Sequence, residues 1–179
     1  YLICDSALGR LLVAGTNKGI CSVKMGDNDA DLLAEFRLEF QNDELIEDAD
    51  YLKKWSAPLQ EYLAGKKIWP VLPYDMQATE FQLKVRKWLC TIPPGITYCY
   101  SDAARSMGMP KAIRAFANAC ATNPIALVIP CHRILPKSGD IGSFRWGAYR
   151  KEKLLQLEHL KATQDSNGPV PNEMDILRL

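Results

Sequence analysis

Three side chains with chemical capability follow one another at Cys131, His132 and Arg133. A free thiol has a pKa of about 8.5, and the thiolate is its nucleophilic form. A neighbouring imidazole or cation raises the thiolate fraction at neutral pH, so this order of side chains fits an activated nucleophile. A plainer interpretation stays open, because most buried cysteines are inert packing residues.

The residues before the triplet must position it. Five apolar residues at 125–129 are ended by Pro130. Their β-branched members predict a short buried strand that carries Cys131 at its end.

The sequence around the triplet resembles the O6-alkylguanine-DNA alkyltransferase family, and most closely the C-terminal domain of the bacterial Ada proteins. The shared features are Asn123-Pro124, Pro130-Cys131-His132-Arg133, Gly139, Gly142, Phe144-Arg145-Trp146-Gly147 and the helical run 151–158 that ends at Glu158. The resemblance implies direct DNA repair, in which the methyl group of O6-methylguanine, and also of O4-methylthymine, moves irreversibly to Cys131. It implies one reaction per molecule on a flipped nucleotide, no cofactor, and a monomer that binds double-stranded DNA containing O6-alkylguanine.

The resemblance also assigns catalytic roles. Cys131 accepts the alkyl group, His132 deprotonates it through a bridging water, and Glu158 orients His132. Asn123 braces the turn and Arg133 holds the loop. The residues alone do not choose between His132 and His159 as the base, since Glu158 adjoins the latter; the family motif selects His132.

A second group of residues is expected to bind the substrate and DNA. Tyr100 contacts the flipped guanine, and Arg114 inserts into the base stack in its place. Trp146 narrows the pocket in favour of methyl over benzyl groups. The full set is Tyr100, Lys111, Arg114, Ala115, Arg133, Arg145, Trp146 and Lys151. Arg86 stands where relatives often carry Trp, which we expect to alter packing rather than chemistry.

Residues 79–121 carry a helix-turn-helix pattern. Thr79 and Gln82 have capping-box spacing and begin a helix that Pro93-Pro94-Gly95 ends. A short helix at 102–107, a turn at 108–110 and an alanine-rich helix at 111–121, with Ile113 facing inward, follow. Small side chains suit close approach to a DNA groove, but close helix–helix packing explains them equally well.

The N-terminal half predicts strands at 1–4, 10–14 and 20–25, a helix from Asp29, and a helix near 49–64 that Pro58 interrupts or bends. Residues 66–78 are too proline-rich for a helix. We therefore expect an α/β domain at 1–78, ribonuclease H-like by resemblance. A mainly α, winged-helix-like helix-turn-helix domain at 79–161 and a flexible tail at 162–179 complete the prediction.

Composition and charge narrow the class of protein. No apolar run reaches the roughly 20 residues of a membrane helix, and no signal peptide is visible at the start, which lacks Met. Six cysteines within apolar segments indicate reduced thiols in a cytoplasm, and two histidines without a Cys-x-x-Cys pair argue against zinc.

Residues 27–50 carry a net charge of −9 and residues 105–153 a net charge of +7. A basic segment that coincides with a helix-turn-helix pattern predicts a phosphate-binding surface.

Three other interpretations remain open from the sequence. If the chain is the C-terminal part of an Ada protein, it is the repair domain of an adaptive-response regulator, and a further N-terminal domain would carry transcriptional activation. A cysteine hydrolase needs a thiol and an imidazole that meet in space together with an oxyanion hole. A damage-sensing relative without catalysis carries Trp in place of the reactive cysteine, whereas this chain has Cys131.

Overall fold

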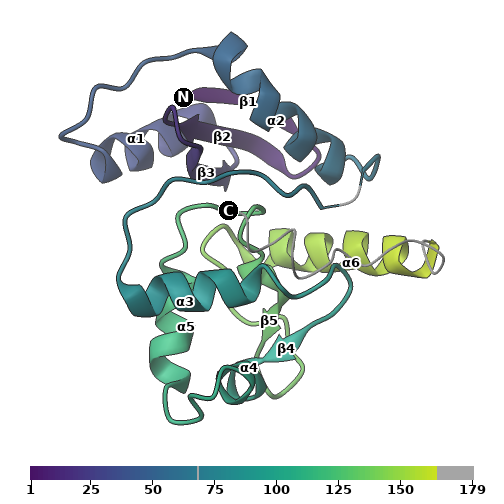
Figure 1. The fold of residues 1–179 in the computed structure, drawn as a ribbon. Helices are drawn as coiled ribbons and strands as arrows, with labels where there is room; N and C mark the ends of the chain where they lie inside the picture. The colour runs from purple at the N-terminus through teal and green to yellow at the C-terminus, as the bar shows by residue number, and fades with distance from the viewer. Residues whose placement is uncertain (68, 165–179) are drawn as a thin grey trace. The chain divides into compact units, whose positions relative to one another are not determined.

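The structure is a computed structural model that describes residues 1–67 and 69–164. The chain forms two compact units (Figure 1). The first comprises Tyr1–Met76 and Pro124–Val128, and the second comprises Gln77–Asn123 and the chain from Ile129 onward. The return of residues 124–128 to the first unit has no counterpart in the sequence prediction.

The first unit is built on an antiparallel sheet in the order β1 (Leu2–Ser6), β2 (Gly9–Gly15) and β3 (Ile20–Gly26). Helix α1 (Asp29–Glu39) packs Leu32 and Phe36 against Leu12 and Ala14 of β2. Helix α2 (Ala49–Leu63) continues through Pro58 without ending. The predicted strands and helices of this half are confirmed.

The second unit is mainly helical. Its elements are α3 (Glu80–Leu89), β4 (Tyr98–Cys99), α4 (Tyr100–Ser106), α5 (Ile113–Ala121), the 3-10 turn η1 (Cys131–Arg133), β5 (Ile134–Leu135) and α6 (Ala148–Gln164). The capping box of Thr79 and Gln82 is present at the start of α3. Strands β4 and β5 pair in parallel. Phe116 of α5 is buried between the rings of Trp88 and Tyr100, so one residue ties α5 to α3 and α4.

Helices α4 and α5 form the predicted helix-turn-helix. Gly108 adopts a φ of 71°, which an L side chain rarely takes, and Met109 N donates to Ala104 O at 2.9 Å to close the turn. The start of α5 differs from the prediction, because Lys111 still belongs to the turn and the helix begins at Ile113. Ile113 was expected to face inward and is instead 40% exposed.

The strand predicted at 125–129 is wrong. Ile125 forms a single bridge with Val23, and residues 126–128 make a turn in which Leu127 has a φ of 69°. Ala126 N still donates to Val23 O at 3.1 Å, but Val128 N donates to Ala126 O at 2.7 Å, so the backbone turns instead of continuing as a strand. All five residues are nevertheless buried, which accounts for the apolar sequence that suggested a strand.

Helix α6 extends to Gln164, so the first residues of the predicted tail are helical. The remainder of that prediction, residues 165–179, lies outside the described residues. Among the helices of the described chain, none is both long and apolar enough to cross a membrane.

Candidate active site

Cys131 begins η1 and is buried, with 6% of its surface exposed. Asn123 Nδ2 donates to Cys131 Sγ at 3.3 Å and to Ile129 O at 3.0 Å. Burial raises the pKa of Cys131, and the hydrogen bond from Asn123 opposes that rise. One amide thus fixes both the backbone before the thiol and the sulfur itself.

The next two residues form a buried ion cluster with Glu158 of α6. Glu158 Oε1 lies 2.9 Å from His132 Nε2 and 2.8 Å from Arg133 Nη2, while Arg133 Nε donates to Glu158 Oε2 at 2.9 Å. Arg133 also donates to the backbone oxygen of Ile92. Burial alone would raise the pKa of Glu158, but His132 and Arg133 outweigh it, so that pKa is lowered.

Burial favours the neutral form of the His132 imidazole. Burial lowers its pKa, although Glu158 acts in the opposite direction. The contact with Glu158 assigns the proton to Nε2, because a carboxylate can only accept. Nδ1 then carries a lone pair, and no described residue donates a hydrogen bond to it. This nitrogen is able to accept a proton.

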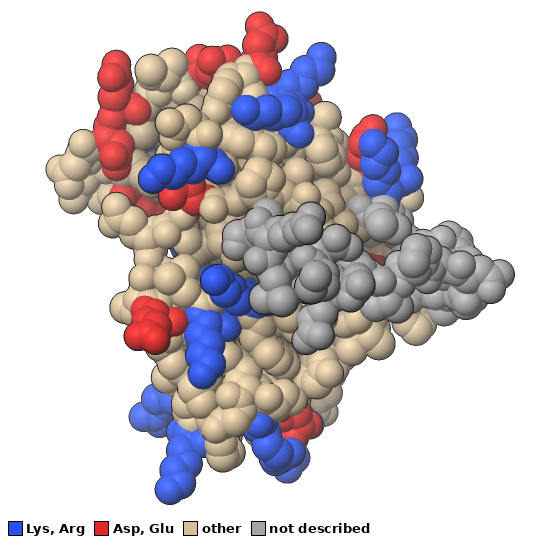
Figure 2. All heavy atoms as spheres, in the orientation of Figure 1, with Lys and Arg blue, Asp and Glu red and all other residues tan. Residues whose placement is uncertain are grey.

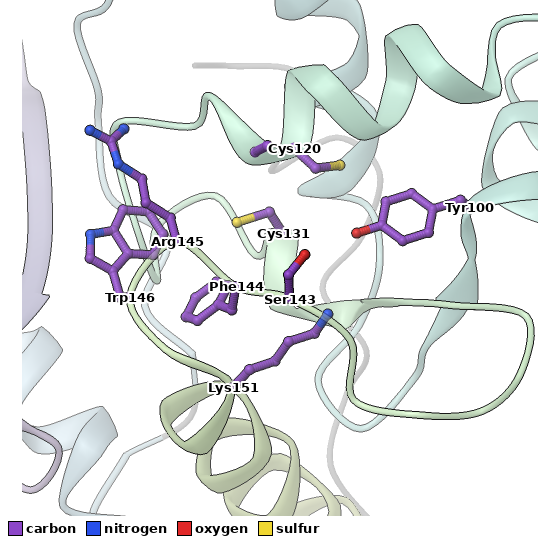
Figure 3. Close-up of a pocket in the computed structure, with 9 residues that line it drawn as sticks. Tyr100, Cys120, Cys131, Ser143, Phe144, Arg145, Trp146 and Lys151 are labelled. Atoms are coloured by element: carbon purple, nitrogen blue, oxygen red, sulfur yellow. The ribbon is translucent and has the colours of Figure 1, made fainter.

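A pocket of about 300 Å³ opens at Cys131 (Figure 3). The hydroxyl end of Tyr100 from α4 and the ammonium end of Lys151 from α6 point inward. Phe144 and Trp146 meet edge to face with ring centroids 5.0 Å apart. The lining residues are Tyr100, Cys120, Ala121, Cys131, Ser143, Phe144, Arg145, Trp146 and Lys151.

Two of the expected surface bases lie in the interior. Arg133 is fully buried in the ion cluster, and Lys151 is 1% exposed with Nζ donating to Ile134 O at 2.7 Å. Burial lowers the pKa of Lys151. These two bases of the 105–153 segment are therefore not exposed for phosphate binding; Arg133 holds the loop through Ile92 O, and Lys151 lines the pocket.

Three other expected residues lie outside the pocket. Lys111, Arg114 and Ala115 are exposed at the turn before α5 and on its first turn. Figure 2 shows lysine and arginine side chains at this end of the second unit. The structure therefore groups the predicted residues into a pocket, a buried ion cluster and an exposed helix start.

The sequence analysis missed two pocket residues with chemical capability, Ser143 and Cys120. Cys120 is the one beside the other thiol of the pocket. It lies four residues after Phe116 on the buried side of α5, and that spacing was the available signal. Burial raises the pKa of the Cys120 thiol, which keeps it protonated beside Cys131.

A helix-turn-helix unit combined with a buried thiol in a pocket is the arrangement expected of a DNA-binding domain with a cysteine nucleophile. Two family models match the chain. The ribonuclease-like domain of 6-O-methylguanine DNA methyltransferase matches residues 1–71, and the DNA binding domain of the same family matches residues 80–160. The chain belongs to the 6-O-methylguanine DNA methyltransferase family, which confirms the family and the fold class expected from the sequence.

Individual relatives agree with this assignment. The inducible methylated-DNA–protein-cysteine methyltransferase of Bacillus subtilis is 37% identical over 88% of this chain and 88% of its own. The bifunctional transcriptional activator/DNA repair enzyme Ada of Escherichia coli is 39% identical over 88% of this chain, which spans only 45% of Ada. A Mycobacterium tuberculosis OGT crystallised in complex with DNA superposes with a TM-score of 0.70 at 27% identity, covering 98% of this chain and 97% of that one.

Proposed function

We propose that the chain repairs O6-methylguanine in double-stranded DNA by transferring the methyl group to Cys131. The observation that supports this most directly is a buried thiol that lines a pocket, accepts a hydrogen bond from Asn123 and is followed in the chain by His132, whose pKa burial lowers. Family membership and the DNA complex of the M. tuberculosis relative supply the substrate class.

The proposed reaction is an in-line displacement. His132 Nδ1 takes the thiol proton through a bridging water, and Glu158 stabilises the resulting imidazolium. The thiolate forms a bond to the methyl carbon while the bond from that carbon to O6 breaks. The bonding pair passes to O6 and the guanine ring, which takes up a proton from solvent at N1, while the His132 imidazolium releases the thiol proton to solvent. The thioether is stable, so each molecule reacts once and needs no cofactor.

Donors in the pocket favour the departing guanine. Burial raises the pKa of Tyr100, so its hydroxyl stays protonated and donates to the flipped base at N3. A backbone N–H near Arg145 stabilises the charge that develops on O6. The buried ammonium of Lys151 adds a fixed positive charge at the pocket wall.

The thiol reaches the methyl group only if the nucleotide leaves the duplex, at a cost of a few kcal/mol. Arg114, exposed at the start of α5, inserts into the stack and offsets that cost. Lys111 contacts phosphate, and the small side chain of Ala115 lets the helix approach the groove. The same chemistry extends to O4-methylthymine, which also carries a methyl group on an exocyclic oxygen.

The proposal describes a monomeric, cytoplasmic repair activity. It does not extend to transcriptional activation, which appears in the name of the Ada relative, because this chain spans less than half of that protein.

The deciding measurement is the intact mass and peptide map after incubation with a duplex that contains O6-methylguanine. We expect one added methyl group per molecule, on Cys131, and none in Cys131→Ala. Cys4→Ala is the matched control, since Cys4 lies in the first unit and should leave the reaction unchanged. Tight binding without a change in mass would instead indicate a damage sensor with an inert thiol.

A further inference from the structure

The feature that the proposed mechanism leaves unused is a buried arginine on α3. Arg86 is 3% exposed, whereas its helix neighbours Lys84 and Lys87 are exposed. Its Nη2 donates to the backbone oxygen of Thr122 at 2.9 Å. Thr122 is the C-cap of α5, so the guanidinium lies at the negative end of that helix, where a cation is stabilising.

A second side chain of α3 contacts the same residue. Gln82 Nε2 donates to Thr122 Oγ1 at 3.4 Å, and Thr122 Oγ1 donates to Asn118 O at 2.9 Å. Gln82 and Arg86 are four residues apart, which places them on one face of α3. The end of α5 is therefore fixed through both its backbone and its side chain.

The residue that follows is Asn123, whose amide contacts the reactive thiol. Asn123 is fully buried, and its Nδ2 donates to Ile129 O and to Cys131 Sγ. A hydrogen bond to sulfur weakens steeply with distance and angle, so the donor must stay in place to favour the thiolate. The contact of Arg86 is one peptide unit away from this donor.

We propose that Arg86 is a positioning residue for Cys131, whose buried guanidinium holds the Thr122 carbonyl and so keeps the Asn123 amide against the sulfur. The charge acts in the same direction: burial raises the pKa of Cys131, the hydrogen bond from Asn123 lowers it, and the cations of Lys151 and Arg86 lower it further. The effect of Arg86 on the Cys131 thiol does not depend on the proposed function. Only the further effect on methyl transfer rests on it.

The test is the pH profile of Cys131 alkylation by iodoacetamide, read site-specifically by peptide mass mapping. In Arg86→Met the midpoint should rise by about half a unit or more, with a roughly three-fold slower rate at pH 7. Arg86→Lys keeps the charge and should restore most of the profile. Lys87→Met removes an exposed cation from the same helix and should match the wild type. Arg86→Gln gives the same test if the Met variant does not fold.

A double-mutant cycle tests the route through Asn123. If Arg86 acts by holding that amide, Arg86→Met should shift the profile much less in an Asn123→Ala background than in the wild type. An unshifted midpoint in Arg86→Met or Arg86→Gln, or equal shifts with and without Asn123, would overturn the inference.

The two proposals fail separately. Absence of methyl transfer by the wild-type protein would overturn the proposed function, while the iodoacetamide profile would still report on Arg86. Normal transfer by the wild type with an unshifted variant profile would overturn only the role of Arg86.

Discussion

Cys131 is followed in the chain by His132 and Arg133, and both of these residues contact the buried carboxylate of Glu158. Glu158 accepts from both His132 and Arg133 inside the protein. Burying charges is costly, and removing one member of such a pair typically costs about 3–5 kcal/mol because the other charge is left uncompensated. With a neutral His132 the charges of Glu158 and Arg133 balance, and this is the state that the proposed role of His132 as a base requires.

This cluster predicts a loss of stability in acid. The folded-state pKa of Glu158 is lowered, so its contribution is fully present above the unfolded value of about 4.3 and is lost as the pH falls. The folded-state pKa of His132 is also lowered, so protonation below about 6.5 favours the unfolded state. Both effects have the same sign. Chemical denaturation should show stability falling from pH 7.5 to pH 5, and again toward pH 4.

We assign the fall in folding stability between pH 7.5 and pH 5 to His132. His132→Gln should flatten it, whereas His159→Gln, at an exposed position on the same helix as Glu158, should leave it unchanged. An unaltered pH dependence in His132→Gln would contradict the assignment.

Trp146 sets the expected range of alkyl groups. Its ring is 5% exposed, lines the pocket and packs against Phe144. We expect the wild type to react faster with O6-methylguanine than with O6-benzylguanine. Trp146→Ala should raise the benzyl rate by about ten-fold, since steric relief in a pocket is worth about 1–3 kcal/mol. Single-turnover rates with both substrates check this, and equal wild-type rates would rule it out.

At the scale of elements, α3 depends on a local cap. Thr79 Oγ1 accepts from Gln82 N, and Gln82 returns a bond to the Thr79 backbone. Thr79→Ala should destabilise the second unit by about 1 kcal/mol, as measured by urea denaturation, and leave the chemistry at Cys131 intact. Thr97→Ala, at an exposed position outside the helices, is the control. If Thr79→Ala lowered the free energy of unfolding no more than Thr97→Ala does, the cap would contribute nothing to stability.

The same scale shows what sequence reasoning recovers. The cap of α3, the strands of the first unit and the helix-turn-helix depend on spacing within a few residues, and the prediction found them. Residues 125–129 differ because a strand is defined by backbone pairing with a neighbouring strand, and here the pairing is the single bridge of Ile125 with Val23. Apolar composition reports burial, which all five residues share, but it does not report the turn at Leu127.

At the scale of the whole molecule, the sequence shows the sign of each charge but not its exposure. The triplet at Cys131 was visible because its members are adjacent. The family resemblance brought in Glu158, which is distant in sequence. Nothing in the sequence revealed that Arg133 and Lys151 are buried, or that Arg86 is buried beside the end of α5. The contact that carries the inference about Arg86 requires tertiary structure.

Exposed charge leads to the last prediction, which concerns DNA affinity. The chain has a net charge of only +1, yet several cations of the second unit are exposed. Among them are Arg105, Lys111, Arg114, Lys137 and Arg145. If about four of them neutralise phosphates, log K should fall with log salt with a slope of about −3 to −4.

Fluorescence anisotropy with a duplex between 50 and 200 mM salt measures that slope. Lys111→Met should reduce its magnitude by about 1, because one released counterion is lost. Lys18→Met removes an exposed cation from the first unit and should leave the slope unchanged. A wild-type slope near zero would mean that affinity comes from the pocket and the inserted side chain instead. If both variants reduced the magnitude of the slope equally, DNA binding would depend on the net charge of the chain and not on the cations at the start of α5.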